Sequence, residues 1–243
     1  MRLTGCGGKP ACVRSDRVPD AEVIPGVKWG RPEWVPSAAY WAAMSEIADN
    51  SDDFVSTETT LKEQVGFCLL GGFGITAEMN HAIFDRLDAE GIFRPHNIPT
   101  AAEIERLLRL PVNVEGKLRR YRFPNQRSSR LATALRLIEE DPPSPDDPRT
   151  FRNELIKIPS IGPKTASWIT RNWLGSDDVA ILDIHIIRAG VLIGLFDRRQ
   201  TVPKDYDAME ARFLEFAAAL QVRPSLLDAV MWREMRQLGR GPV

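Results

Sequence analysis

Apolar side chains recur every three or four positions along most of this 243-residue chain, which is the spacing of one face of an α-helix. The clearest stripe consists of Tyr206, Met209, Phe213, Phe216 and Leu220. Further helical patterns begin near Pro36, Thr60, Thr76, Thr100, Ser128 or Ser129, and Pro224. Only residues 179–182 have the composition of a strand, and they are too few to build a sheet. The pattern predicts an all-α fold.

Polar residues and glycines mark where several of these helices begin and end. Thr60-Leu-Lys-Glu63 and Thr100-Ala-Ala-Glu103 have the form of a capping box, in which threonine and glutamate side chains satisfy free backbone amides. Thr76 is expected to cap the intervening helix, and Gly71-Gly72 to end the first. Residues 141–150, rich in proline and aspartate, are predicted to form a connection.

The most informative segment is a short turn between two apolar-patterned stretches, Pro159-Ser-Ile-Gly162. Gly162 can adopt a positive φ, and Pro163 suits the first position of a helix. Such a turn leaves backbone N–H groups at a helix start without partners, and these groups bind phosphate without reading base sequence. Taken alone, the same residues are also compatible with an ordinary corner between two helices.

Lys164 lies in the first turn of the helix predicted after this turn. The positive end of the helix dipole disfavours the charged amine there by a few tenths to ~1 kcal/mol, so the position favours a neutral amine. A neutral amine can attack the anomeric carbon of a nucleoside and form a Schiff base after the base departs. The alternative is a solvated surface lysine.

Asp183 follows Lys164 by nineteen positions, where a further helix is expected to begin. As the N-cap of that helix, its carboxylate would have a fixed direction, suited to stabilising oxocarbenium-like charge and handling the proton of the lysine. The helix over residues 163–174 should rise ~18 Å, and Gly175–Asp178 can reverse the chain to bring Asp183 back. His185 is compatible with either an assisting or a packing role.

The segment Leu155–Arg188 resembles the helix-hairpin-helix (HhH-GPD) DNA glycosylase superfamily, and within it the archaeal-type 8-oxoguanine DNA glycosylase/AP lyases. In that family the hairpin reads apolar-Pro-Gly-apolar-Gly, a lysine follows two residues later, and an apolar-Asp-x-His segment lies downstream. Ile158–Gly162, Lys164 and Leu182–His185 match this pattern. The resemblance implies that Lys164 is the Schiff-base nucleophile and that Asp183 is the catalytic aspartate.

The similarity covers roughly residues 60–238, and this chain departs from the family at two places. Ser160 stands where the family commonly has glycine, which is expected to alter the shape of the hairpin. The tail Gly239–Val243 differs from the short lysine-terminated end that helps archaeal relatives recognise the lesion. The identity of the excised base therefore stays open.

The resemblance also implies two helical subdomains preceded by an extension. Residues 1–35, rich in glycine, proline and charge, are expected to form an irregular N-terminal extension. Residues 36–243 are expected to form the glycosylase domain. Within it, residues 36–75 and 185–243 should make one subdomain and about 76–184 the hairpin-bearing one.

Nine cations fall in a stretch where Glu115 is the only acid: Arg106, Arg109, Lys117, Arg119, Arg120, Arg122, Arg127, Arg130 and Arg136. In a chain of net charge −1, this local excess favours a face for the DNA backbone over a solvated helix face. The predicted phosphate-binding residues are Ser160, Gly162 and Pro163 of the hairpin together with Arg127.

A base must be flipped out of the stack and held against apolar or aromatic faces before it is excised. The resemblance points to Phe123 and Trp232 as faces of the base pocket, although each is as compatible with core packing. Phe73, in a Gly-Gly-Phe-Gly loop, stands where relatives carry the residue that fills the vacated stack.

Composition excludes several other classes of protein. Cys6, Cys12 and Cys68 show neither metal-ligand spacing nor a disulfide framework, and no run of residues approaches the ~20 apolar positions of a membrane span. The beginning of the chain lacks the apolar core of a signal peptide. We expect an intracellular, cytoplasmic and nucleoid-associated monomer that needs no metal or cofactor.

Together these features predict a base-excision repair enzyme, a DNA glycosylase with AP lyase activity that removes 8-oxoguanine from double-stranded DNA. Two alternatives stay open: the same chemistry on a different modified base, or a non-catalytic DNA-binding module in which Lys164 only contacts phosphate. An iron–sulphur glycosylase is disfavoured because no cysteine cluster follows the last predicted helices.

Overall fold

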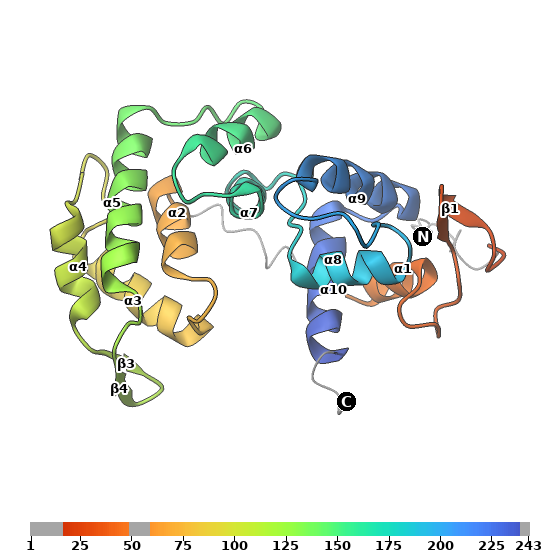
Figure 1. Cartoon of the computed structure of the whole chain (residues 1–243), viewed down its shortest axis with the longest axis horizontal. Helices are drawn as coiled ribbons and strands as arrows, with labels where there is room; N and C mark the ends of the chain where they lie inside the picture. The colour runs from red at the N-terminus through yellow and green to blue at the C-terminus, as the bar shows by residue number, and fades with distance from the viewer. Residues whose placement is uncertain (1–16, 49–58, 239–243) are drawn as a thin grey trace, which may run out of the picture.

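The computed structural model describes residues 17–48 and 59–238, so the first sixteen residues and the divergent tail at 239–243 lie outside it. Its helices are α1 (Ala38–Ile47), α2 (Leu61–Leu70), α3 (Ala77–Ala89), α4 (Ala101–Arg109), α5 (Pro124–Glu140), α6 (Pro148–Lys157), α7 (Pro163–Leu174), α8 (Ile184–Leu192), α9 (Tyr206–Leu220) and α10 (Pro224–Leu238). Two small antiparallel hairpins pair β1 (Glu22–Ile24) with β2 (Val27–Lys28) and β3 (Val112–Val114) with β4 (Lys117–Arg119). Helices form the body of the molecule, which confirms the predicted all-α class (Figure 1). Within the described ranges, no helix is long and apolar enough to cross a membrane.

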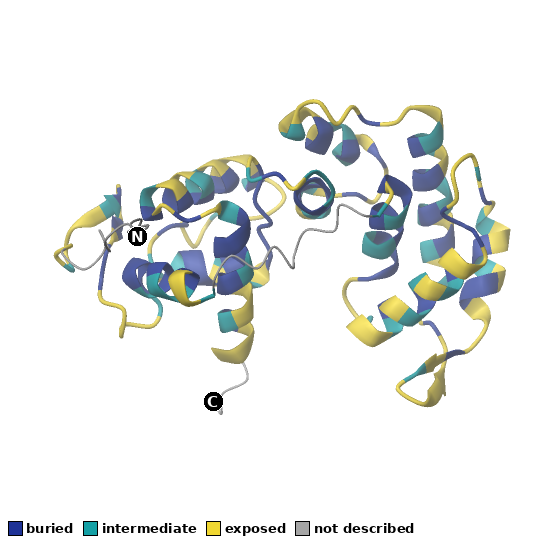
Figure 2. Ribbon diagram, turned by 180° about the vertical axis from the view of Figure 1, so that it is seen from behind, coloured by how far each residue is buried: buried dark blue, intermediate teal, exposed yellow. Residues whose placement is uncertain are grey.

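The buried apolar side chains form two separate clusters, each of which is the core of one subdomain. The C-terminal subdomain contains β1, β2, α1 and α8–α10, and the hairpin subdomain contains α2–α7, β3 and β4. Figures 1 and 2 show the two bodies side by side, with α7 between them. The described residues thus form two helical subdomains, and α7 lies where they meet.

The position of α2 corrects the expected boundary between the subdomains. Residues 36–75 were expected to belong with the C-terminal helices, but Leu61, Val65 and Leu69 of α2 are buried in the hairpin core. The helix packs against α3, α5 and α7. Only α1 packs on α10 as expected, so the chain changes subdomain between α1 and α2.

The N-terminal extension is more regular than the composition indicated. Ile24, Val27 and Trp29 are buried in the C-terminal core, and β1 packs against α9. The guanidinium of Arg212 donates hydrogen bonds of 2.6 Å to the carbonyl of Pro25 and 2.6 Å to that of Leu195. Residues 17–35 are thus part of the folded subdomain, because a two-stranded hairpin this small is stable only when it packs on something larger.

Most helix starts agree with the capping residues read from the sequence. At α2 both hydrogen bonds of the capping box are present, and the hydroxyls of Thr76 and Thr100 each accept a hydrogen bond from an amide three residues on. The prediction that α5 starts at Ser128 or Ser129 was wrong. The helix begins at Pro124, because proline is favoured at the first helical position, and Ser128 instead donates to the carbonyl of Asn125 within it.

Residues 179–182 form no strand, although their composition indicated one. They run as a buried connection between α7 and α8, held by side chains of α9. Glu210 accepts a hydrogen bond of 2.9 Å from the amide of Ala180, and the Tyr206 hydroxyl donates one of 2.7 Å to the Ala180 carbonyl. This connection fixes the backbone that leads into Asp183.

Glu210 also joins α9 to the hairpin subdomain. Its carboxylate lies 3.2 Å from the guanidinium of Arg152 on α6, and it accepts a 3.2 Å hydrogen bond from the hydroxyl of Ser167 on α7. Burial raises the pKa of Glu210, and these partners oppose that shift. Arg152 and Glu210 are both buried, so each partly compensates the other for lost hydration. Arg152 also lies 3.4 Å from the largely exposed Asp207.

The hairpin between α6 and α7 differs from its expected backbone. Ser160 has a φ of 76°, whereas Gly162 has a φ of −89° and serves as the N-cap of α7. The left-handed conformation therefore falls on the residue that replaces the family's glycine. Buried Ile158 and Ile161 anchor the turn in the hairpin core.

We expect Ser160→Gly to raise the free energy of unfolding by about 1 kcal/mol, because a side chain in the left-handed region costs about that much. Urea denaturation followed by circular dichroism measures the change. Ser160→Ala is the matched control, since it removes the hydroxyl and keeps the strained Cβ, and it should give no gain. A stability of Ser160→Gly at or below that of the unchanged protein would contradict the assignment of strain.

We expect Glu210→Ala to lower the free energy of unfolding by roughly 3 kcal/mol, because Arg152 would keep a buried charge without its buried partner. Glu215→Ala, an exposed position on the same helix, should change it by less than about 0.5 kcal/mol. Equal losses in the two variants would show that the buried carboxylate does not hold the subdomains together.

Candidate active site

Lys164, Asp183 and Trp232 line one cavity of about 330 Å³ at the junction of the two subdomains. Its walls come from α7, the 179–183 connection, the first turn of α8, and α10. The complete lining is Lys164, Trp168, Arg171, Ile181, Asp183, Ile186, Asp228, Ala229, Trp232 and Arg233. The two predicted catalytic residues are thus brought together from different subdomains.

Lys164 is exposed in the first turn of α7, directly after the hairpin. It lies close enough to Cys68 on α2 for the two groups to interact electrostatically. Burial raises the pKa of the Cys68 thiol, so this sulphur stays protonated beside the amine at neutral pH. No side chain within the described residues caps α7, which leaves the amides of its first turn available to a ligand.

Asp183 is the N-cap of α8, as the sequence indicated. Its Oδ1 accepts hydrogen bonds of 2.8 Å from the amide of His185 and 3.0 Å from that of Ile186. These bonds fix the direction of a carboxylate that is only 9% exposed. Because both use Oδ1, the second oxygen remains free to face a substrate in the cavity.

Asp228 and Arg171 were missed by the sequence analysis and form a buried ion pair in the cavity wall. The pair joins α7 to α10. Burial raises the pKa of Asp228 to about 6 against the opposing charge of Arg171, and the nearby charge of Asp183 adds to the rise. Asp228 Oδ2 is buried and has no hydrogen-bond partner among the described residues.

The helical period contained a signal for part of this wall. Lys164, Trp168 and Arg171 are spaced i, i+4 and i+7, so they share one face of α7. Trp168 continues that face into the hairpin subdomain, where its ring stacks on Phe67 with 6.2 Å between centroids. Asp228 gave no comparable signal. A single carboxylate within an apolar helical pattern is normally interpreted as a solvent-facing residue at the edge of the apolar face.

The predicted aromatic residues fall in two places. Trp232 lines the cavity and is 41% exposed, with the His185 ring edge-on at 6.5 Å and the Arg236 guanidinium 4.4 Å from its centroid. Phe123 is not in the cavity wall; it is the N-cap residue of α5 and lies under the loop that carries Phe73. Phe123 therefore does not lie with Lys164, Asp183 and Trp232 in this cavity.

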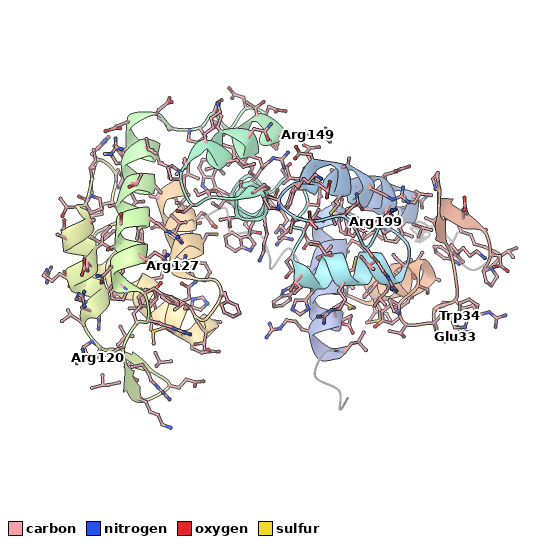
Figure 3. The ribbon with its side chains drawn as sticks, viewed as in Figure 1. Glu33, Trp34, Arg120, Arg127, Arg149 and Arg199 are labelled. Atoms are coloured by element: carbon pink, nitrogen blue, oxygen red, sulfur yellow. The ribbon has the colours of Figure 1, made fainter. Side chains whose placement is uncertain are left out.

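Phe73 is 99% exposed at the tip of its loop. The flanking Gly72 and Gly74 have φ values of 100° and 83°, a conformation that only glycine adopts readily. Arg127, half-buried in the first turn of α5, approaches this loop at Gly72 (Figure 3). Arg127 therefore supports the loop rather than the α6–α7 hairpin.

The basic stretch divides into paired and unpaired cations. Arg109 and Arg136 form i,i+4 ion pairs with Glu105 and Glu140, two acids that lie just outside the stretch. The remaining exposed cations of β4 and the segment after it have no acidic partner within the described residues. The stretch is thus not one uniform face.

The hairpin itself is open to a ligand on its outer side. A Cβ atom added at Gly162 would meet no atom within 4 Å, so nothing in the fold requires glycine there for packing. Ser160 and Gly162 are both exposed, and Pro163 is partly so. Close approach of a ligand to the backbone is compatible with this open surface.

The chain is similar in sequence to known proteins. An 8-oxoguanine DNA glycosylase/AP lyase from Thermoplasma acidophilum is 33% identical over 121 residues, which cover 49% of this chain and 58% of that protein. The chain thus spans less than two thirds of the length of this curated relative.

Solved structures share the fold. The crystal structure of the 8-oxoguanine DNA glycosylase of Thermotoga maritima matches with a TM-score of 0.54 and 25% identity, covering 85% of this chain and 88% of that chain. The 8-oxoguanine glycosylase/lyase of Methanocaldococcus jannaschii, crystallised with a 15mer DNA containing 8-oxoguanine, matches with a TM-score of 0.57 and 22% identity, covering 84% and 100%. The family model described as 8-oxoguanine DNA glycosylase matches residues 47–222, well over half of the chain. The chain therefore belongs to the 8-oxoguanine DNA glycosylase family.

Proposed function

We propose that this protein is a bifunctional DNA glycosylase/AP lyase that removes 8-oxoguanine from double-stranded DNA. The observation that carries the proposal is the single cavity in which Lys164 and Asp183 meet beside Trp232. The name and activity of the Thermoplasma relative support the same reaction. The protein acts on DNA inside the cell, as a monomer.

The chemistry assigns one step to each catalytic side chain. The neutral amine of Lys164 attacks C1′ of the damaged nucleoside, the bond from C1′ to the base breaks, and the base leaves with its electron pair and takes up a proton. Asp183 stabilises the positive charge that develops at C1′ as this bond breaks. Loss of the amine proton and opening of the sugar ring then give the Schiff base.

The Schiff base also explains the lyase step. Its positive charge acidifies the proton at C2′, and removal of that proton expels the 3′ phosphate by breaking the C3′–O bond. Water then hydrolyses the imine and releases Lys164. No metal or cofactor enters any of these steps.

The fold supplies a binding mode for the duplex and the base. The backbone N–H groups of Ser160 and Gly162, with those that follow Pro163 in the first turn of α7, hold one phosphate, which binds without sequence preference. Pro163 itself has no N–H and contributes the fixed start of the helix. The flipped base stacks on Trp232, which lines the cavity together with Asp228. Phe73 fills the gap left in the duplex.

Borohydride trapping tests the reaction directly, because it reduces the Schiff base to a stable covalent adduct. We expect an adduct with a duplex that contains 8-oxoguanine, and no adduct with Lys164→Ala or Lys164→Gln. A panel of duplexes with other modified bases, run in parallel, separates this substrate from a different one. If no duplex of the panel gave an adduct, the result would favour the alternative that the protein is a non-catalytic DNA-binding module.

Asp183→Asn separates the two roles of this carboxylate. Asparagine caps a helix about as well as aspartate, so we expect stability to change by less than about 0.5 kcal/mol. Removal of the charge should lower the single-turnover excision rate at least 100-fold. Asp183→Ala, which loses cap and charge together, should also lose about 1 kcal/mol of stability. Full activity in Asp183→Asn would reduce Asp183 to a capping residue.

A further inference from the structure

The β3–β4 hairpin carries cations on a defined face. Val112 pairs with Arg119 and Val114 with Lys117, so these four side chains point to the same side of the two-stranded ribbon. Val112 is buried in the hairpin core, and β3 packs against α3. Leu118 is on the opposite side and is 77% exposed. Lys117 and Arg119 thus lie on the side of the ribbon that faces α3, and both are exposed.

Between this ribbon and α3 lies an open cavity of about 440 Å³. Its lining comes from the loop after Phe73, the first turn of α3, the ribbon, and the segment that follows it. Four cations contribute to it: Lys117, Arg119, Arg120 and Arg122. It begins one residue beyond the tip of the Phe73 loop, at Gly74.

None of these four cations forms an ion pair with an acid of the described residues, and all four are exposed. The guanidinium of Arg122 lies 5.1 Å from the centre of the Phe123 ring, which holds it beside Gly74. Two carboxylates, Glu78 and Glu115, also line the cavity. Glu78 is engaged with the hydroxyl of Thr76 and its own amide at the start of α3, and these bonds lower its pKa. The lining keeps an excess of positive charge.

The location excludes a role in the cavity that holds Lys164. The β3–β4 hairpin lies at the far end of the hairpin subdomain from α6, as both views show (Figures 1 and 2). Figure 3 labels Arg120 beside this ribbon, away from the junction of the two subdomains. The hairpin subdomain therefore carries two separate candidate phosphate contacts: the free amides at the start of α7, and the cations of the β3–β4 ribbon beside the Phe73 loop.

We propose that the cavity between β3–β4 and α3 is a second binding site for the backbone phosphates of duplex DNA, next to the Phe73 loop. Unpaired, exposed cations that converge on a cleft are suited to the continuous negative charge of a nucleic-acid backbone. The site rests on the proposed function, since it serves the same duplex, but it contributes binding rather than chemistry. Its place beside Phe73 would hold the backbone of the segment into which that ring inserts.

The salt dependence of binding tests the site without requiring catalysis. For an undamaged duplex, the slope of log K against log of the salt concentration should become shallower by about 2 in Lys117→Gln/Arg119→Gln, since each lost phosphate contact contributes ~0.9. Affinity near 0.1 M salt should fall roughly tenfold. Titration by fluorescence anisotropy over a series of salt concentrations measures both quantities.

Two controls make the outcome specific. Arg198→Gln/Lys204→Gln removes the same charge from exposed positions of the C-terminal subdomain, and Leu118→Ser changes the opposite side of the ribbon. Both should keep the slope of the unchanged protein. An unchanged slope in the ribbon variant, or an equal loss in the charge control, would overturn the site. Lysine trapping reports the chemistry separately, so failure of the reaction and failure of this site give different results.

Discussion

Two buried ion pairs hold the subdomains in the one arrangement that forms the candidate active site. Arg152 and Glu210 link α6 to α9, and Arg171 and Asp228 link α7 to α10. Each of the four side chains is no more than 7% exposed. Separating such a pair without restoring water to both partners is strongly unfavourable, so the pairs oppose any opening at this junction.

The catalytic geometry depends on that constraint because its two main groups come from different cores. Lys164 belongs to α7 in the hairpin subdomain, and Asp183 precedes α8 in the C-terminal subdomain. Hydrogen bonds from Glu210 and Tyr206 to Ala180 hold the connection that ends at Asp183. The residues that place the carboxylate therefore also join the subdomains.

The two carboxylates of the cavity have different environments, which suits them to different tasks. Asp183 accepts two backbone hydrogen bonds through one oxygen. Asp228 is buried against Arg171, and burial raises its pKa. In the proposed reaction, the fixed carboxylate of Asp183 stabilises charge at the sugar. Asp228 belongs to the cavity wall, where it joins α10 to α7 through Arg171.

The sequence predicted local structure better than it predicted the contacts between elements. The period of apolar residues and the capping threonines located most helices, and the spacing from Lys164 to Asp183 singled out two residues that line one cavity. The sequence did not predict the subdomain to which α2 belongs, because the apolar face of a helix does not specify which other helices it packs against. Strands of three residues, such as β3 and β4, are too short for an alternation of apolar and polar residues to be recognised in the sequence. Buried Arg171 also went unnoticed, since a charged residue in a helix is normally exposed.

The start of α7 shows why the chemistry could nevertheless be inferred. Six of the described helices, α1, α2, α3, α4, α6 and α8, are capped by a side chain that accepts a backbone hydrogen bond. At α7 the N-cap is Gly162, the first turn holds no acid, and Lys164 stands against the dipole. A missing cap and an opposed charge each cost about 1 kcal/mol or less.

Packing does not explain why glycine is the N-cap of α7. Ile161 and Ala166 already anchor the helix in the hairpin core, and a Cβ atom at Gly162 would meet no atom within 4 Å. A phosphate on the free amides would offset the missing cap. Because the amides and the amine belong to the same turn, the chain itself fixes the distance between docked phosphate and nucleophile. In the proposed reaction, one helix therefore sets which nucleotide of the strand faces the amine, and the ion pairs between the subdomains bring Asp183 to the same place.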